Sequence, residues 1–227
     1  MWPTRGFTRA LAASPGLSVI AEIKRRSPSK GPLNVDLDPL GVSEAYEAGG
    51  ATCLSVLTDA EFFGGSIDDL NIARASTALP VLRKDFTVSP RDVADARLMG
   101  ADAVLLIVAA IDRAELLEFH ELATSLDLDA LVEVHDEAEL EIALGVGATL
   151  IGVNQRDLVT FEVDHERAAR MATAIPATVA KVAESGVRDR DDAKRLAAAG
   201  YDAILVGETL VTAGDVGATL RALRGMG

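Results

Sequence analysis

RLMGADAVLLIV, residues 97–108, contains the pattern that decides the fold: a helical segment, a glycine and then a short apolar run. A glycine in the left-handed conformation commonly closes a helix, and an unbroken apolar run is typical of a strand buried on both faces. The same order recurs in EAGGATCLSVL (47–57), LGVGATLIGV (144–153) and AAAGYDAILVG (197–207). The sequence therefore predicts four tight connections from a helix into a buried strand.

Further apolar runs precede the first of these four or lie between them, at LSVIAEI, LPVLRKDF, LDALVEVH and ATVAKVAES. Together the runs predict eight strands, which start near residues 18, 51, 80, 102, 129, 149, 178 and 202. Amphipathic segments predict eight helices, at about 39–49, 67–77, 89–99, 112–126, 136–146, 164–174, 189–199 and 214–224. Asp112, Asp136 and Asp164 are suitable N-caps for three of these helices.

Strict alternation of strands and helices, with strand starts 20 to 33 residues apart, favours an α/β fold. We predict a single (β/α)8 TIM barrel over residues 1–227, in which 1–17 form a short N-terminal extension. A doubly wound open sheet is the alternative. That fold would more naturally carry a glycine-rich dinucleotide loop after the first strand, and the sequence has SPSKG there instead.

The charge of the chain restricts its partners. A net charge of −13 would repel a phosphate backbone, so a nucleic-acid partner is not expected. An anionic ligand would need a local positive site within this acidic shell. We expect a small-molecule partner and a monomer, although the sequence does not exclude an oligomer.

Several features favour a cytoplasmic protein. The single cysteine, Cys53, cannot form an internal disulfide, which fits a reducing compartment. The N-terminal apolar region is broken by Pro15 and Gly16, which argues against a secretion signal. No run approaches the roughly 20 apolar residues that a membrane span requires.

Polar residues gather where the predicted strands end. In VIAEIKRRSPSKG (19–31), Glu22 and Lys24 share a strand face with Ile20. The carboxyl ends of all strands meet at one mouth of a TIM barrel, where active sites form. The residues expected at this mouth are Glu22, Lys24, Lys84, Glu133, Asn154, Arg156 and Glu184.

A structural ion network is the alternative interpretation of these residues. Burying several ionised groups costs roughly several kcal/mol each before pairing, and all of them occupy the same end of the barrel. This favours a catalytic site. Arg83 and Lys181 do not fit the pattern, because strict alternation turns them toward the helices. They lie at the rim, or a bulge shifts the register.

The loops after the seventh and eighth strands are typical of phosphate binding. One loop reads ESGV (184–187) and the other VGETLV (206–211), which is long enough for one extra helical turn. Glycine lets backbone N–H groups approach an anion, and a helix start adds a favourable dipole. In TIM barrels these two loops commonly grip phosphate, so we expect a small phosphorylated ligand.

The motifs resemble those of the indole-3-glycerol-phosphate synthase family. The resemblance covers about residues 7–215 and consists, in order, of IAEIKRRSPSKG, LSVLTDAEFFGGSIDDL, PVLRKDF, LVEVHDEAEL, IGVNQRDL, VAESGV and ILVGETLV. The first and fifth motifs are highly specific, whereas related phosphate-binding barrels have loops similar to the last two. The resemblance implies ring closure of 1-(2-carboxyphenylamino)-1-deoxyribulose 5-phosphate, with loss of carbon dioxide and water.

The resemblance also implies roles for individual residues. Lys84 would be the proton donor at the ketone, and a buried lysine with a lowered pKa suits that role. Lys24 and Glu133 would act in the dehydration that follows, although which lysine serves which step stays open. Glu22 would orient Lys24 and the substrate, Asn154 and Glu184 would hold the intermediate, and Ser185 belongs with these catalytic residues. Further roles are implied for residues that contact the substrate (Ser27, Phe86, Arg156) or bind phosphate (Ser185, Gly186, Gly207, Glu208).

No cofactor or metal is expected. His120, His135 and His165 are scattered without ligand spacing, and the implied chemistry requires no nucleotide or redox group. We expect His120 on a helix surface. His135 shares the inner face of its strand with Glu133 and could touch the substrate. Phe86 could equally be an ordinary core residue.

The N-terminus departs from the family, whose members usually carry a longer extension with an additional helix that helps cover the barrel mouth. Residues 7–13 resemble the last short helix of that extension.

Two rival functions stay open. A phosphoribosylanthranilate isomerase would need a Cys and an Asp at strand ends, whereas Cys53 lies in mid-strand. A non-catalytic binding protein would not need both Lys84 and Glu133.

Overall fold

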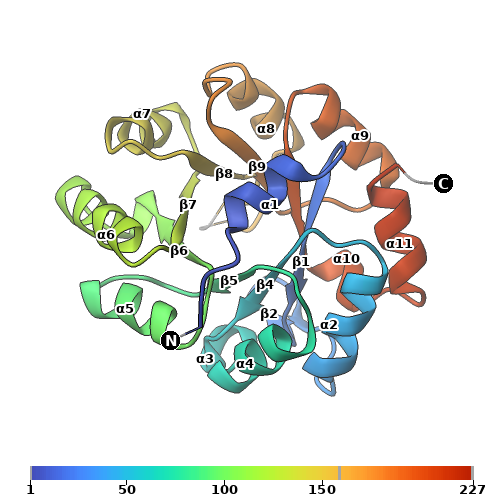
Figure 1. Cartoon of the computed structure of the whole chain (residues 1–227). Coiled ribbons are helices and arrows are strands. Elements are labelled where there is room, and N and C mark those ends of the chain that lie inside the picture. The colour runs from blue at the N-terminus through green and yellow to red at the C-terminus, as the bar shows by residue number, and fades with distance from the viewer. Residues whose placement is uncertain (1, 158–159, 226–227) are drawn as a thin grey trace.

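A computed structural model describes residues 2–157 and 160–225 of the chain. Eight parallel strands form a closed barrel, which Figure 1 shows from one end of its axis. These strands are β1 (Ser18–Ile23), β4 (Cys53–Leu57), β5 (Val81–Lys84), β6 (Ala103–Ile107), β7 (Asp129–Val134), β8 (Leu150–Asn154), β9 (Ala180–Glu184) and β10 (Ala203–Val206). The predicted TIM barrel is confirmed, and the closure of β1 onto both β10 and β4 excludes the open sheet.

The helices surround the barrel in the predicted order. They are α2 (Pro39–Ala48), α4 (Ile67–Ser76), α5 (Pro90–Leu98), α6 (Arg113–Ser125), α7 (Glu137–Gly145), α8 (His165–Ala172), α9 (Arg190–Ala198) and α11 (Val216–Leu223). Asp112, Asp136 and Asp164 accept hydrogen bonds from backbone N–H groups in the first turns of α6, α7 and α8. These N-caps satisfy helix donors that would otherwise lack partners.

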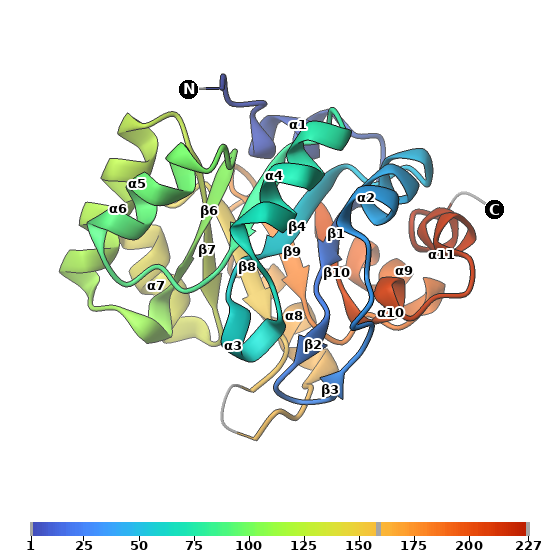
Figure 2. The same ribbon diagram turned by 90° about the horizontal axis from the view of Figure 1, so that it is seen from below.

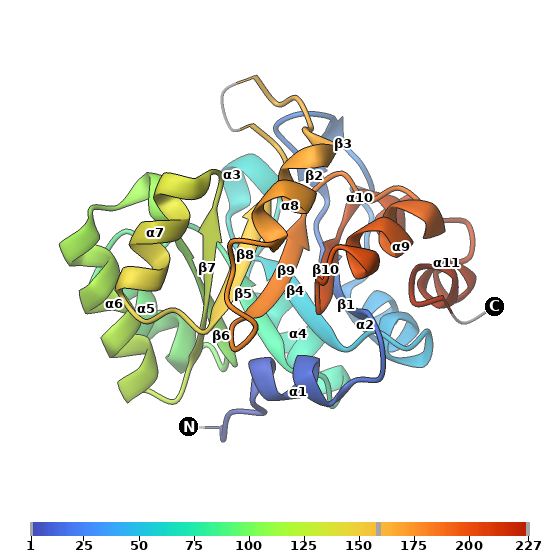
Figure 3. The ribbon, with the colours of Figure 1, turned by 90° about the horizontal axis from the view of Figure 1, so that it is seen from above.

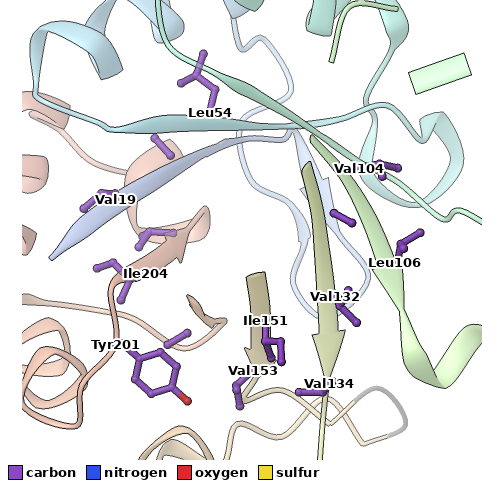
Figure 4. Packing of buried hydrophobic residues seen from close by; sticks show 14 of the residues in the cluster. Val19, Leu54, Val104, Leu106, Val132, Val134, Ile151, Val153, Tyr201 and Ile204 are labelled. Carbon is purple, nitrogen blue, oxygen red and sulfur yellow. The ribbon is translucent and has the colours of Figure 1, made fainter. Parts of the chain in front are cut away.

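Each strand divides its residues between two cores. Side chains on the outer face of the strands share one apolar cluster with side chains of the helices. Figure 4 shows Val19, Leu54, Ile151 and other strand residues of this cluster. The inner face builds a separate apolar cluster that fills the lower barrel and includes Ile20, Leu82 and Leu131. On β1, β5, β7 and β9, alternation carries the inner face from an apolar residue of this cluster up to a polar residue, so the apolar layer supports the side chains above it.

The predicted N-terminal helix, α1 (Phe7–Ala13), closes the floor of the barrel. Phe7 and Leu11 of α1 are buried in the inner cluster. Figures 2 and 3 show α1 at the end of the barrel opposite to the short strands β2 (Arg26–Ser27) and β3 (Gly31–Pro32). The resemblance of residues 7–13 to a short helix of the family's extension did not indicate this position, in which Phe7 and Leu11 face the interior from below.

Asp102, at the start of β6, fastens this floor. Its buried carboxylate accepts hydrogen bonds from the backbone N–H of Arg5 at 2.7 Å and of Val81 at 2.8 Å. It also pairs with Arg74 of α4 at 2.5 Å. One side chain therefore joins the N-terminal segment, β5 and α4.

Five small elements of the described chain either were not predicted or were predicted only in outline. β2 and β3 form a hairpin after β1, and α3 (Ala60–Phe63) follows β4. A 3-10 turn, η1 (Val108–Ala110), follows β6, and α10 (Glu208–Val211) is the extra helical turn expected after β10. Within the described residues, no helix is long and apolar enough to cross a membrane.

Arg83 and Lys181 face the helices, and the strand registers around them are continuous. The Arg83 guanidinium donates to the Asp92 carbonyl oxygen in α5 at 3.1 Å. Lys181 donates from Nζ to the Ala172 carbonyl oxygen at the end of α8 at 2.8 Å. Both residues bond to a helix backbone, and the proposed bulge is not needed.

Candidate active site

A pocket of about 840 Å³ opens at the carboxyl ends of the strands. Every residue that the sequence assigned to catalysis, substrate binding or phosphate binding lines it. These residues are Glu22, Lys24, Ser27, Lys84, Phe86, Glu133, Asn154, Arg156, Glu184, Ser185, Gly186, Gly207 and Glu208. The barrel thus brings together, in one cavity, side chains from six of its eight strands or from the loops that follow them.

Lys84 stands at the centre of the polar layer. Its Nζ lies 3.4 Å from Glu133 Oε2 and 3.8 Å from Glu184 Oε2. The other oxygen of Glu133 accepts a hydrogen bond from Asn154 Nδ2 at 3.0 Å. All four residues are inner-face residues at the ends of β5, β7, β8 and β9, so the alternation of the strands fixes their meeting.

The electrostatic state of Lys84 differs from the expectation. Burial disfavours its charge, but the carboxylates of Glu133, Glu184 and Glu22 outweigh burial and raise the pKa of Lys84. The expected lowering of this pKa is wrong, because the sequence could not reveal that three carboxylates surround the amine. Lys84 is therefore a stable ammonium group at neutral pH.

The two carboxylates beside Lys84 are pushed in opposite directions. Burial opposes ionisation of Glu133, but the Lys84 charge and the Asn154 hydrogen bond outweigh it and lower the pKa of Glu133. Burial and the neighbouring Glu133 charge raise the pKa of Glu184 to about 8. Two carboxyl groups with separated pKa values can serve as a base and an acid at the same pH.

Gly152 makes room for Glu184. This glycine lies on β8, and a Cβ built on it would overlap Oε1 of Glu184. The same oxygen is buried and has no hydrogen-bond partner among the described residues. This role of Gly152 was not predicted, since a glycine in mid-strand reveals nothing of the side chain that crosses it from β9.

We predict that Gly152→Ala lowers kcat about 10- to 100-fold while the protein stays folded. The added methyl displaces the Glu184 carboxyl, and a misplacement of about 1 Å in a catalytic group can cost about 100-fold. Steady-state turnover and thermal melting would test this. Gly214→Ala is the matched control, because a Cβ at Gly214 meets no atom within 4 Å. Equal kcat values for the two variants would refute the role of Gly152.

Glu22 and Lys24 form a second ion pair on the other side of the pocket, with Lys24 Nζ 2.5 Å from Glu22 Oε1. A Cβ on Gly207 would overlap this same oxygen and would approach Lys24 Nζ to 2.8 Å. Gly207 therefore has a steric role beside its predicted role in the phosphate loop. The polar end of β1 is explained by its position in the pocket wall.

Aromatic residues line the rim. Phe86 is 45% exposed, so it is not an ordinary core residue. Its ring lies 6.5 Å from the Phe62 ring, centroid to centroid, in an edge-to-face arrangement. Phe62 and Phe161 also line the pocket, and neither was predicted there. The strand pattern that predicted the other residues does not reach these two, because both lie outside the barrel strands.

Arg156 lies in the loop after β8. Its backbone N–H donates to Asn154 Oδ1 at 3.0 Å, and its guanidinium donates to the Phe161 carbonyl oxygen at 2.9 Å. A bridge between Arg156 and Val163 closes the base of this loop. The arginine is thus held at the rim, next to the amide that contacts Glu133.

The two glycine-containing loops lie together, as phosphate binding would require. Ser185 and Gly186 both have positive φ angles, 66° and 74°. Thr209 joins the loops, since its hydroxyl donates to the Val187 carbonyl oxygen at 2.6 Å. Glu208 begins α10.

Two cations at this end of the pocket were missed. Lys30 of the hairpin loop lies with its Nζ 3.8 Å from Glu208 Oε1. Arg188 also lines the pocket, and Asp192 holds its guanidinium. The SPSKG motif contained Lys30, but the direction of its side chain depends on a hairpin that periodicity does not predict.

His165 lies with the site residues, whereas His135 and Cys53 do not. His165 lines the pocket, whereas His135 does not and lies behind Glu133, so the expected contact of His135 with substrate is not supported. Cys53 is buried at the floor, where its thiol lies 3.8 Å from the Phe7 carbonyl oxygen. In the part of the chain that the structure describes, no cluster of His, Cys, Asp and Glu is arranged to hold a metal ion.

Comparisons with known proteins identify the family of this chain. The family model for indole-3-glycerol phosphate synthase matches residues 1–223. The indole-3-glycerol phosphate synthase 2 of Streptomyces coelicolor is 51% identical over 223 residues, which are 98% of this chain and 86% of the relative. The synthase of Parafrankia sp. is 54% identical over 206 residues, 91% of this chain and 77% of the relative.

Among solved structures, a thiamine phosphate pyrophosphorylase from Pyrococcus furiosus superimposes with a TM-score of 0.69 at 20% identity, over 92% of this chain and 95% of that one. This likeness shows the fold alone. The family model and the sequence relatives go further, because they match almost the whole chain. The chain belongs to the indole-3-glycerol phosphate synthase family.

Proposed function

We propose that this protein closes the pyrrole ring of 1-(2-carboxyphenylamino)-1-deoxyribulose 5-phosphate to give indole-3-glycerol phosphate, carbon dioxide and water. Family membership supports the reaction. The observation that carries the assignment of residues is the position of Lys84, between Glu133 and Glu184 in the pocket wall. The phosphate loops at the other end of the same pocket fit the substrate's phosphate.

Lys84 would act in the ring-closing step. The aromatic carbon attacks the ketone carbon, a C–C bond forms, and the carbonyl oxygen gains negative charge and then a proton. An ammonium group placed at this oxygen stabilises the developing charge even when its own pKa is raised. Glu184, with a pKa raised to about 8, is mostly neutral at pH 7 and could return the proton to Lys84.

Loss of carbon dioxide follows, and the electrons of the broken C–C bond restore the aromatic ring. Dehydration then needs an acid at the leaving hydroxyl group and a base for the amine proton. We assign the acid to Lys24, which Glu22 orients at 2.5 Å. We assign the base to Glu133, which Asn154 orients and which is ionised because its pKa is lowered.

The remaining predicted residues would bind the substrate. Ser27, Phe86 and Arg156 at the rim would contact the anthranilate part, with Phe86 against the ring. Backbone N–H groups of the loops after β9 and β10 would hold the phosphate. Asn154 and Glu184 would hold the intermediate. The residues proposed for the phosphate are Ser185, Gly186, Gly207 and Glu208.

The rival isomerase reaction is disfavoured by the position of Cys53. Burial raises the pKa of the Cys53 thiol, and the residue lies at the floor, away from the pocket.

We propose further that residues 1–227 form one barrel domain that works as a monomer in the cytoplasm. The net charge of −13 supports a free small-molecule partner rather than a nucleic acid.

The reaction is tested by following indole-3-glycerol phosphate fluorescence after the purified chain is mixed with 1-(2-carboxyphenylamino)-1-deoxyribulose 5-phosphate. We expect turnover. Binding of the substrate without turnover would instead favour a binding protein. Isomerisation of phosphoribosylanthranilate without ring closure would overturn the assignment.

A further inference from the structure

Behind Glu133 lies a partly buried histidine that the proposed mechanism does not use. His135 follows the last residue of β7, on the same face of the chain as Glu133. Its Nε2 lies 3.5 Å from Glu133 Oε1, and its Nδ1 lies 3.0 Å from Oε2 of Glu139 in α7. The imidazole thus stands between two carboxylates, one in the pocket wall and one outside the pocket.

Glu139 fixes the ring. One oxygen of its carboxylate accepts both the backbone N–H of His135, at 2.7 Å, and the ring Nδ1–H. An ionised carboxylate accepts hydrogen bonds and cannot donate them, so Nδ1 carries the proton in every charge state of the ring. The orientation of the imidazole and the identity of the atom that faces Glu133 are therefore both determined.

The other ring nitrogen, Nε2, faces Glu133. It is buried and has no hydrogen-bond partner among the described residues, and Glu133 Oε1 is the acidic oxygen in front of it. A neutral ring would place the Nε2 lone pair against a carboxylate oxygen. A charged ring would place an N–H there instead, and a small movement would complete the hydrogen bond.

We propose that His135 is a positioning residue for the reaction, an imidazolium that Glu139 clamps and that holds Glu133 in its ionised, proton-accepting form. This inference rests on the proposed function, because it concerns the residue assigned there as the base. His135 does not line the pocket, so it acts through Glu133 and not on the substrate.

The charges around the pair agree with this role. Burial disfavours the charge of His135, but the Glu139 hydrogen bond and the charges of Glu133 and Glu139 outweigh burial and raise the pKa of His135. Arg167 of α8 acts against this, and its guanidinium is itself bonded to the Asn154 carbonyl oxygen. Glu133 faces Lys84 and Asn154 on its other sides, so His135 completes a ring of donors around it.

The test is the pH dependence of the single-turnover rate constant in the wild type, His135→Gln and Glu139→Gln. Removing the imidazolium removes a positive charge near Glu133, so the pKa of Glu133 rises and the base stays protonated to higher pH. We expect the acid limb of the profile to move up by about one pH unit in His135→Gln, the size typical of a lost neighbouring charge. The single-turnover rate constant of His135→Gln is then reduced most at low pH and approaches that of the wild type as the pH rises. The substrate concentration that gives half of the maximal rate stays nearly unchanged.

Glu139→Gln provides a second variant. The glutamine oxygen can still accept both hydrogen bonds but carries no charge, so we expect a shift in the same direction and of smaller size. His120→Gln on α6 is the matched control, because His120 lies outside the pocket. Its profile should superimpose on that of the wild type.

An NMR titration gives a readout that is independent of activity. The chain has three histidines, so the His135 ring signals are assigned by their loss in His135→Gln. In the free wild-type protein His135 should titrate above about 6.5, and in Glu133→Gln it should titrate lower than in the wild type.

The outcomes separate this inference from the proposed function. A wild type without turnover would overturn the function, while the NMR titration would still report on His135. An active wild type whose pH profile superimposes on those of both variants would overturn the role of His135. If His135→Gln does not fold, the pH profile of Glu139→Gln decides.

Discussion

Lys84→Ala lowers kcat by about a thousandfold or more, since one residue supplies both a general acid and a positive charge at the developing oxyanion. General acid catalysis contributes about 10²–10⁴, and a single oxyanion donor contributes about 10²–10³. Lys24, the other lysine assigned to the reaction, cannot replace Lys84, because Lys24 is paired with Glu22 at 2.5 Å. Turnover measured by product fluorescence, together with substrate binding measured by calorimetry, would test this.

The matched control is Lys194→Ala, which removes an exposed lysine on α9. Its kcat should stay within a factor of two of the wild type, since exposed ion pairs contribute about 0–1 kcal/mol and this one is remote from the pocket. A Lys84→Ala protein that keeps more than a tenth of the wild-type kcat would contradict the proposed role.

The same variant should change how stability depends on pH. The pKa of Glu133 is lowered in the folded protein, and Lys84 is the largest cause of that lowering. A lowered carboxyl pKa contributes stability above the unfolded value, and this stability is lost as the pH falls through the folded value. The difference in the free energy of unfolding between wild type and Lys84→Ala is therefore large at pH 7 and becomes smaller as the pH falls. Urea unfolding at several pH values would measure it.

Asp102→Ala has the largest expected effect on stability, a loss of about 3–5 kcal/mol in the free energy of unfolding. Asp102 is 0% exposed and pairs with Arg74, which is itself buried. Its removal leaves this guanidinium without its ionic partner and leaves the N–H groups of Arg5 and Val81 without their acceptor. Breaking a buried pair costs more than the pair contributed, because the remaining charge stays buried without a partner.

Urea unfolding followed by circular dichroism would measure this loss. Glu118→Ala, which removes an exposed carboxylate on α6, is the control and should change stability by less than about 0.5 kcal/mol. An Asp102→Ala protein as stable as this control would show that the floor is not held by Asp102.

The sequence predicted the barrel well because its information on the fold is local. The helix–glycine–strand repeat set the positions of the strands, each of which begins within two residues of its predicted start. Alternation then placed Glu22, Lys84, Glu133 and Glu184 at one end. Both signals depend on neighbours along the chain.

What the sequence could not predict depends on neighbours in space. The raised pKa of Lys84 follows from three carboxylates that come from three different strands. The steric role of Gly152 follows from a side chain of β9. The floor position of α1 was missed because an amphipathic segment indicates that one face is buried, and not which end of the barrel buries it.

The bonds that hold α1 have a consequence for the order of events during synthesis on the ribosome. The backbone of Arg5 bonds to Asp102, and that of Thr8 bonds to Asp129, 97 and 121 residues later in the chain. At about 5–20 residues per second, the ribosome needs roughly 6–24 s to make the 121 residues that separate Thr8 from its partner. A helix of seven residues is not stable alone in that interval. Helix α1 therefore emerges long before the strand that bonds to it, and Phe7 and Leu11 stay available to chaperones at least until β7 has been made.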